Sequence, residues 1–486
     1  MLQDADALPQ LIGDYKPLDQ WQAHLNELFY KLRGDKLRSY YQTFASADYR
    51  LAHALAVDYY EQVTKRDAAV KRQASSDKRA TSAPLPITHP SSPLTVLELG
   101  PGNGNLAACF LSHLQNLDTQ GLVYPRVRYI MVDWEQPVLD GALTHPDLAV
   151  HRDRVETYCG VIERIPNVAD RTVDRILCNE LWNDLPTKLM AKNAGDIEEE
   201  FVRPNLSEFL HAQIHDWPGF VRAFEAKDIA ALKAFPPFLD DVVWEKEYRK
   251  VDWKDVPYRK TIAEFLKAIE QQVLVPVNLG AFATLKEAKR LLAPDAVGFS
   301  AFDAGTADMA VLNDPEKPCY GQFGGQYNFM INFALVEAVA THMGIARTAL
   351  EPQREFVGRS LNTNVITLMD LLAVHPSAGP RLQPWEQERL VLKTIKALND
   401  TYESPYHRQF DFPLSKHMPP DERETSGAIL RSLKANGVPD TIAYVTEEEL
   451  TRAMKDLEAV GYDHDTVGIA LTAPPSPIEY CHFFCR

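Results

Sequence analysis

The sequence predicts an α/β protein built on a Rossmann-like, largely parallel β-sheet. From Leu94 onward, short apolar runs alternate with stretches of helical periodicity, a pattern typical of parallel strands covered by helices. The first apolar run ends in a loop with three closely spaced glycines, and later runs end in acidic or amide residues. Because ligands bind at the carboxyl ends of the strands in such folds, we expect the functional site at that edge.

The length and charge of the chain limit what it does. At 486 residues it exceeds one simple core and indicates two domains or one enlarged α/β domain. Its 51 Lys and Arg against 67 Asp and Glu give a net charge of -16, which repels phosphate groups, so neither nucleic acid nor a membrane surface is an expected partner. A hydrophobic content of 45% and a charged content of 24% are typical of a folded enzyme.

The cysteines and the N-terminus predict the compartment. The six cysteines are scattered rather than spaced as a disulfide framework, which favours a reducing environment. The first residues lack the features of a signal peptide, and no stretch approaches the ~20 apolar residues of a membrane span. We therefore expect a cytoplasmic protein.

Changes in composition divide the chain into regions. Residues 1–65 have apolar positions at helical spacing and predict a helical N-terminal lead-in, whereas residues 66–93, rich in Ser, Ala, Lys, Arg and Pro, predict an exposed linker. Residues 94–375 form the expected α/β cofactor-binding domain, with a helical insertion at about 201–293. Residues 380–486 are expected to be mainly helical.

Particular elements are expected within these regions. Four strands of the sheet are predicted at residues 95–99, 128–132, 175–178 and 296–302. A C-terminal helix is predicted at 384–398, and another begins at Thr446, where Glu449 completes a capping box.

The strand at 95–99 runs into a loop with Gly100, Gly102 and Gly104 and then into a helix that starts near Asn105. Glycines permit the tight turn and leave the backbone open to a cofactor, since no Cβ lies in the way. Glu98 stands two residues before the first glycine, where S-adenosylmethionine (SAM) enzymes typically place an acid that helps hold the amino group of the cofactor. Gly102 and Gly104 lie closer together than in a dinucleotide-binding motif, which favours SAM over NAD.

The strand at 128–132 ends in Asp133. A carboxylate at this position can accept hydrogen bonds from both ribose hydroxyls of the cofactor. Asp133 follows Gly104 by 29 residues, and a loop insertion at 118–125 accounts for this long separation. Glu135 is the rival acid and ranks second, because it lies beyond the end of the strand.

The strand at 175–178 ends in Asn179 and Glu180 and continues into an acidic turn with Asp184. These three residues are the catalytic candidates, because they follow a strand at the edge where ligands bind. Carboxylates there can orient a guanidinium through paired hydrogen bonds, or take a proton from an amine or hydroxyl that attacks the methyl group. The alternative for Asp184 is that it caps a following helix.

These motifs resemble those of the MidA-type SAM-dependent methyltransferases. The resemblance covers roughly residues 40–345 and is carried by residues 98–104, 132–133 and 179–186, and more weakly by 302–305 and 325–333. The family includes the mitochondrial protein arginine methyltransferase that assists assembly of respiratory complex I. The resemblance implies a class I methyltransferase fold, SAM as cofactor and an arginine of a partner protein as methyl acceptor.

The chain departs from the family pattern on the acceptor side. Asp184 follows Glu180 by four residues, and the usual alanine before the proline of this block is missing. Residues 41–46 replace the family's Gly-Asp-Phe-x-Thr block, and Gln326 and Asn332 replace acidic residues of a later block. The cofactor half of the resemblance is therefore the better preserved.

Other functions stay open. The acceptor is either a protein arginine or another nitrogen or oxygen nucleophile, including that of a small molecule. A non-catalytic assembly factor that binds SAM belongs to a different class, and an NAD or nucleotide-sugar enzyme is disfavoured by the glycine spacing. No metal is expected, because the ligand-like run at 481–485 lacks two further partners and predicts a docked apolar tail instead.

Overall fold

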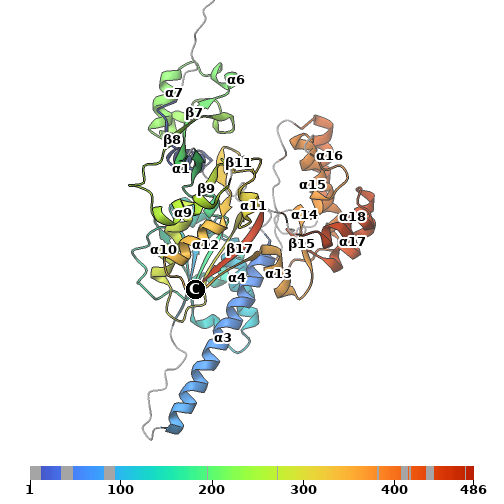
Figure 1. Cartoon of the computed structure of the whole chain (residues 1–486). Helices are drawn as coiled ribbons and strands as arrows, with labels where there is room; N and C mark the ends of the chain where they lie inside the picture. The colour runs from blue at the N-terminus through green and yellow to red at the C-terminus, as the bar shows by residue number, and fades with distance from the viewer. Residues whose placement is uncertain are drawn as a thin grey trace, which may run out of the picture.

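The computed structural model describes residues 12–33, 48–80, 93–193, 195–270, 272–379, 382–406, 414, 418–433, 443–474, 476 and 478–486 (Figure 1). Residues 41–46, which replace a family block, lie outside this described part.

Among the described residues, an eight-stranded sheet forms the centre of the molecule. In spatial order its strands are β14 (Thr348–Pro352), β17 (Glu479–Cys485), β10 (Gly298–Thr306), β5 (Arg175–Asn179), β2 (Leu94–Leu99), β3 (Val127–Asp133) and β4 (Val155–Cys159), and β13 (Ile331–Asn332) pairs with β10. The pairs from β10 to β4 are parallel, whereas β17 is antiparallel to both of its neighbours. The α/β prediction and its four strands are confirmed, with strand ends shifted by a few residues.

Helices cover both faces of this sheet. On one face α3 (Tyr49–Ala80) and α4 (Asn105–Leu117) pack against Val96 of β2. On the other face α10 (Leu279–Leu291) and α12 (Phe333–His342) pack against Leu97. Every residue of β2 is buried. Successive side chains point to opposite faces of the sheet, and both faces are covered, so nearly every residue of the strand is apolar. The remaining elements around this sheet are η2 (Tyr124–Arg126), α5 (Gln136–Ala142), η3 (Pro146–Arg154), η4 (Trp182–Asp184), α9 (Arg259–Ala268), α11 (Met309–Leu312) and α13 (Gln353–Leu361).

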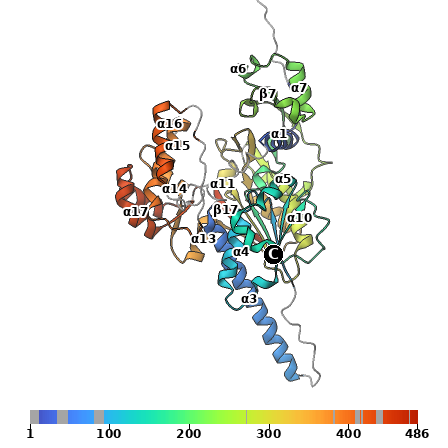
Figure 2. The same cartoon turned by 180° about the vertical axis from the view of Figure 1, so that it is seen from behind.

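Helix α3 corrects the prediction of a linker at 66–93. The helix continues to Ala80 and extends away from the sheet (Figures 1 and 2). Residues 66–80 contain many Ala, Lys, Arg and Gln, which are good helix formers, so a helix begun by the buried first half continues without apolar periodicity. Residues 81–92 lie outside the described part of the chain.

The insertion contributes strands to a second sheet. Its strands are β1 (Lys16–Pro17), β7 (Asp196–Leu206), β6 (Lys188–Asn193) and β9 (Val275–Val277) in spatial order, and β8 (Val242–Lys250) also pairs with β7. Around it lie α1 (Leu18–Arg33), α6 (Glu208–His211), α7 (Trp217–Glu225), α8 (Ile229–Leu232), η5 (Leu239–Asp241) and the hairpin of β11 (Tyr320–Phe323) and β12 (Gln326–Phe329). The expectation of a helical insertion at 201–293 is therefore wrong in part. Strand β8 is largely solvent-exposed and rich in charged residues, so it lacks the apolar alternation by which a strand is found.

The described part of the C-terminal region consists mainly of helices. Its elements are β15 (Val365–Thr367), α14 (Leu368–Ala373), α15 (Pro384–Asn399), α16 (Pro420–Ser432), β16 (Tyr444–Thr446), α17 (Glu447–Ala459) and α18 (His464–Thr472). The capping box of Thr446 and Glu449 is confirmed at the start of α17. The boundary near residue 380 needs a correction, because β17 returns the chain to the central sheet. The docked tail at 481–485 is thus a strand, whose apolar residues pair with β10 and β14.

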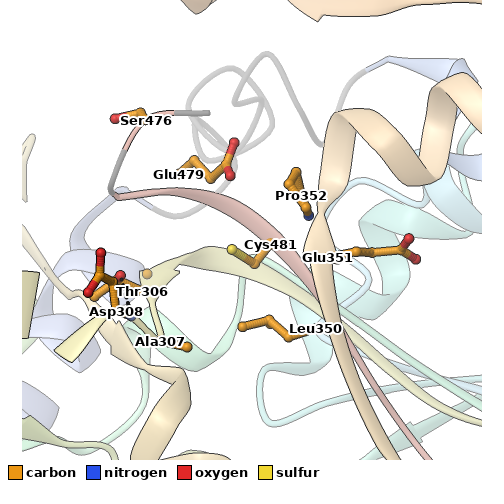
Figure 3. A pocket seen from close by; sticks show the side chains of 10 residues that line it. Thr306, Ala307, Asp308, Leu350, Glu351, Pro352, Ser476, Glu479 and Cys481 are labelled. Atoms are coloured by element: carbon orange, nitrogen blue, oxygen red, sulfur yellow. Dashed lines mark hydrogen bonds between the residues drawn. The ribbon is translucent and has the colours of Figure 1, made fainter. Parts of the chain in front are cut away.

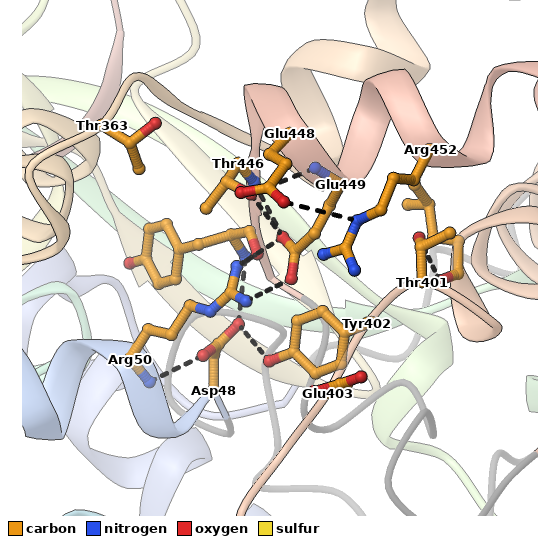
Figure 4. A network of polar contacts seen from close by, with 12 residues as sticks. Asp48, Arg50, Thr363, Thr401, Tyr402, Glu403, Thr446, Glu448, Glu449 and Arg452 are labelled. Carbon is orange, nitrogen blue, oxygen red and sulfur yellow. Dashed lines mark hydrogen bonds and ion pairs between the residues drawn. The ribbon is translucent and has the colours of Figure 1, made fainter.

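A buried network of polar contacts fastens the C-terminal region to the start of α3 (Figure 4). The guanidinium of Arg50 donates to both carboxylate oxygens of Glu449, at 2.9 and 2.6 Å. It also donates to the carbonyl oxygen of Tyr444 at 2.7 Å. The carboxylate of Asp48 accepts from the backbone of Tyr444 at 3.0 Å and from the hydroxyl of Tyr402 at 3.2 Å. Arg50 and Glu449, which are 399 positions apart along the chain, are therefore joined beside the first turn of α3.

Candidate functional site

The glycine loop lies where the strand order changes direction. Strand β2 has β3 on one side and β5 on the other, and the backbone N–H of Gly100 donates to the carbonyl of Val132 at 2.9 Å. In doubly wound sheets this arrangement opens a crevice at the carboxyl ends of the strands. The predicted residues of both halves follow β2, β3 and β5 and are brought to this one edge.

The three glycines of the loop all have positive φ, but a Cβ would meet different surroundings at each. At Gly104 it would lie 2.8 Å from the carbonyl oxygen of Ala142, and at Gly100 it would lie 3.1 Å from the side chain of Leu181. At Gly102 it would meet no atom within 4 Å. Gly100 and Gly104 therefore allow close packing of the chain, whereas the backbone at Gly102 faces open space that a cofactor can approach.

Glu98 is buried beneath the loop. The hydroxyl of Tyr129 donates to its carboxylate at 2.9 Å, and burial raises the pKa of Glu98 to about 8. Asn105, the first residue of α4, is also buried, and its backbone N–H donates to the side chain of Asn103 at 3.0 Å. Both residues are thus fixed within the protein directly behind the loop.

Asp133 lies at the carboxyl end of β3. Its carboxylate accepts the backbone N–H of Glu135 at 2.9 Å, and burial, assisted by the charge of Glu135, raises the pKa of Asp133 to about 6. The carboxylate is therefore mostly ionised at neutral pH and can accept hydrogen bonds. Glu135 is the residue before α5, and Trp134 between the two acids is 41% exposed.

Asn179 and Glu180 lie at the carboxyl end of β5. The side-chain oxygen Oδ1 of Asn179 is buried and has no hydrogen-bond partner among the described residues. Glu180 has a φ of +49°, and its backbone N–H donates to the carbonyl of Phe302 at 2.8 Å. Left-handed backbone at a residue other than glycine is uncommon and is concentrated at functional sites, so the strain at Glu180 supports a functional role for this edge.

Asp184 lies in η4 and is hydrogen-bonded from two other elements. Its Oδ2 accepts from the hydroxyl of Tyr30 at 2.7 Å and from Nε2 of Gln326 at 2.5 Å. Its Oδ1 is buried without a partner in the described part of the chain. Burial raises the pKa of Asp184 to about 8, although the hydrogen bond from Gln326 opposes this shift. The alternative role of capping a following helix is not observed, since the next element is strand β6.

Two residues of this edge were missed by sequence reasoning. Asp303 on β10 is 1% exposed, and its carboxylate accepts the backbone N–H of Asn183 at 3.1 Å. Burial and the charges of Glu180 and Asp184 raise the pKa of Asp303. Its position near the end of an expected strand was the available signal. No sequence pattern indicated a role for Tyr30, because it lies in a helix more than 150 residues before Asp184.

A cavity of about 270 Å³ lies farther along the same edge, between β10, β14 and β17 (Figure 3). Its lining includes the carboxylates of Asp308, Glu351 and Glu479. Glu351 is already paired with Arg359 and His482. None of the site residues predicted from the sequence lines this cavity.

Two searches of the described residues gave negative results. No helix there is both long and apolar enough to cross a membrane. In the same part of the chain, no group of His, Cys, Asp and Glu side chains is arranged to hold a metal ion.

The fold, with its glycine loop at the carboxyl edge of the central sheet, is that of a Rossmann-like, class I methyltransferase. A family model described as "Putative S-adenosyl-L-methionine-dependent methyltransferase" matches residues 85–300. The matched segment contains the glycine loop, Asp133 and the acidic turn that follows β5. The chain is a SAM-dependent methyltransferase, and SAM is its cofactor.

Solved structures similar to the chain include two from Burkholderia thailandensis. An uncharacterized protein is 15% identical over 79% of this chain and 84% of its own, with a TM-score of 0.45. A "likely methyl transferase" bound to S-adenosyl-homocysteine (SAH) is 12% identical over 89% of this chain and 87% of its own, with a TM-score of 0.42. A SAM-dependent methyltransferase from Aquifex aeolicus is 12% identical over 54% and 76%, with a TM-score of 0.25. No curated protein gave a significant match.

Proposed function

We propose that this methyltransferase acts on a nucleophile that brings several N–H donors to the carboxyl edge of β5, and that an arginine of a partner protein is the first candidate. The observation that carries the proposal is that two oxygens of residues following β5, Oδ1 of Asn179 and Oδ1 of Asp184, are buried and have no hydrogen-bond partner among the described residues. A buried acceptor without a donor costs roughly 1–3 kcal/mol, so a ligand that supplies N–H groups here is stabilised. A guanidinium supplies five such donors, whereas an alcohol supplies one.

The charge of this edge supports the same acceptor class. Burial raises the pKa of Asp184 and of Asp303, and the charges of Glu180 and Asp184 raise the pKa of Asp303 further. A cation that binds beside them lowers their pKa values and is held by the ionised forms. The resemblance to MidA-type enzymes independently favours arginine.

The residues of the cofactor half fit SAM. Gly102 presents open backbone, and Gly100 and Gly104 pack closely within the loop. We assign Asp133 to the ribose hydroxyls, and Glu98 and Asn105 to support of the loop. SAM supplies an activated methyl group, so no metal is needed for the transfer. The protein residues then align the acceptor and exclude water. We assign Asn179 and Glu180 to orientation of the acceptor and Asp184 to removal of its proton, since a pKa near the working pH suits a general base.

The test begins with calorimetric titration of the full chain with SAM. The chain is then incubated with radiolabelled SAM and, separately, with arginine-containing peptides and with a panel of small amines, phenols and carboxylic acids. Label on the peptides supports the proposal. Label on a small molecule alone overturns the protein acceptor in favour of a small-molecule N- or O-methyltransferase. Binding of SAM without transfer to any acceptor favours the non-catalytic assembly factor.

Two variants separate the halves of the site. Asp184→Asn is expected to lower kcat/KM by about 100-fold while it leaves the SAM dissociation constant unchanged. Asp133→Ala is expected to lose SAM binding, and Glu180→Gln to keep it. The reverse pattern contradicts the assignment of cofactor and acceptor residues.

A further inference from the structure

We propose that Tyr30 of α1 is a positioning residue that connects the cofactor half of the site with the acceptor half. The inference rests on the proposed role of Asp184. Helix α1, which carries Tyr30, is thereby assigned to the functional site.

The hydroxyl of Tyr30 has a fixed direction. Nε2 of Gln326 donates to this hydroxyl at 2.9 Å and to Oδ2 of Asp184 at 2.5 Å. Since an amide N–H cannot accept, the hydroxyl proton of Tyr30 is directed at Oδ2 of Asp184, 2.7 Å away. Both hydrogen bonds reach one carboxylate oxygen, which leaves Oδ1 for the acceptor.

The ring of Tyr30 contacts the other half of the site. It meets the indole of Trp134 edge to face, with ring centroids 6.0 Å apart and an interplanar angle of 83°. Trp134 directly follows Asp133, the residue that we assign to the ribose. One side chain therefore touches the ends of both the cofactor strand and the acceptor turn.

Helix α1 is held in register with this turn by a stripe of polar residues, of which Gln22 and Asn26 are buried and Tyr30 is partly buried. Gln22, Asn26 and Tyr30 are four residues apart, so they share one face of the helix. Nε2 of Gln22 donates to the carbonyl of Leu185 at 3.0 Å, and its Oε1 accepts the N–H of Thr187 at 2.9 Å. Asn26 donates to the carbonyl of Asp184 at 3.2 Å. The helix thus fixes the backbone of the turn as well as the carboxylate.

The titratable groups beside Asp184 are Tyr30 from α1, which donates to its carboxylate, and Asp303 from β10, whose pKa is raised by the charge of Asp184. The charge of Glu180, at the end of β5, also raises the pKa of Asp303. Tyr30 donates to the ionised form of Asp184, so its hydroxyl favours ionisation, whereas an ionised Asp303 opposes it. Removing the hydroxyl is therefore expected to raise the pH at which Asp184 ionises.

The first test follows the free energy of unfolding from pH 5 to pH 9. A buried carboxyl with a raised pKa makes the protein less stable as pH rises, until the group is ionised in the folded state. In Tyr30→Phe this decline is expected to extend about one pH unit higher than in the wild type, and in the background of Asp184→Asn the same change is expected to have no pH-dependent effect. Tyr248→Phe is the matched control, because Tyr248 donates to Glu200 at 3.0 Å away from the site.

An equal loss of stability at every pH, with or without Asp184, would show a merely structural tyrosine and overturn the proposal. No methyl acceptor is needed for this test, so its result is independent of whether arginine is the substrate.

The second test measures the dissociation constant of SAH by calorimetry. Tyr30→Phe keeps the ring contact with Trp134 and is expected to change the constant less than about twofold. Tyr30→Ala loses the contact and is expected to weaken SAH binding about fivefold to tenfold. Unchanged SAH binding in Tyr30→Ala contradicts the connection to the cofactor half.

Discussion

At the scale of single residues, Gly102 and Gly104 differ in what an added methyl group would meet. In Gly104→Ala the new Cβ would lie 2.8 Å from the carbonyl of Ala142 at a φ of +83°, and we expect a loss of about 2–4 kcal/mol in the free energy of unfolding. In Gly102→Ala the Cβ enters open space, so we expect a loss of only about 1 kcal/mol but at least a tenfold loss of SAM affinity. Chemical denaturation and calorimetry measure both effects. Wild-type SAM affinity in Gly102→Ala would show that the cofactor does not approach there.

The ribose-binding role that we propose for Asp133 predicts a pH dependence of SAM binding. Its pKa is about 6, and only the ionised carboxylate accepts hydrogen bonds from both ribose hydroxyls. SAM affinity is therefore expected to be full above this pH and to fall as the pH drops through 6. Calorimetry between pH 5 and pH 8 should show this fall in the wild type and not in Asp133→Ala, which binds weakly throughout. Glu135→Ala is the control, and an equal loss of affinity there would favour the rival acid.

At the scale of elements, strand β17 brings the C-terminal residues into the central sheet. Its residues pair with both β10 and β14, so removal of β17 would leave β14 without a strand to pair with. Deletion of residues 479–486 is expected to abolish cooperative folding, because β10 and β14 then expose unpaired backbone and apolar side chains. Deletion of Arg486 alone leaves β17 complete and is the control. Circular dichroism during heating measures both, and a cooperative transition in the longer deletion would contradict the expectation.

At the scale of the whole molecule, the Arg50 and Glu449 pair fastens the C-terminal region to α3. Their side chains are each 6% exposed, so Arg50→Met leaves a buried carboxylate unpaired, and we expect a cost of about 3–5 kcal/mol. The matched control is Arg452→Met, which removes a pair with Glu448 at 4.0 Å whose side chains are 50% and 81% exposed. We expect that change to cost less than about 0.5 kcal/mol. Urea denaturation of the full chain distinguishes the two, and equal costs would contradict a fastening role.

Part of the fold followed from local pattern, and part did not. The strands β2, β3, β5 and β10 were predicted because each is an apolar run buried on both faces. Strand β8 of the insertion was not predicted, because most of its residues are exposed or charged and the apolar alternation of a half-buried strand is missing. The helical residues 66–80 were assigned to a linker because this segment has no apolar residues at helical spacing, and the apolar pattern is what identifies a helix in a sequence.

The sequence by itself determined the strand, glycine loop and helix where we propose that SAM binds, because these elements are contiguous and the loop conformation depends on residues that are neighbours in the chain. Only the tertiary structure decided which residues lie together on the proposed acceptor side. Asp184, Tyr30, Gln326 and Asp303 come from four elements spread over nearly 300 residues. Their hydrogen bonds, and the raised pKa values of Asp184 and Asp303, depend on burial. That burial depends on how distant elements pack, which no local pattern of residues records.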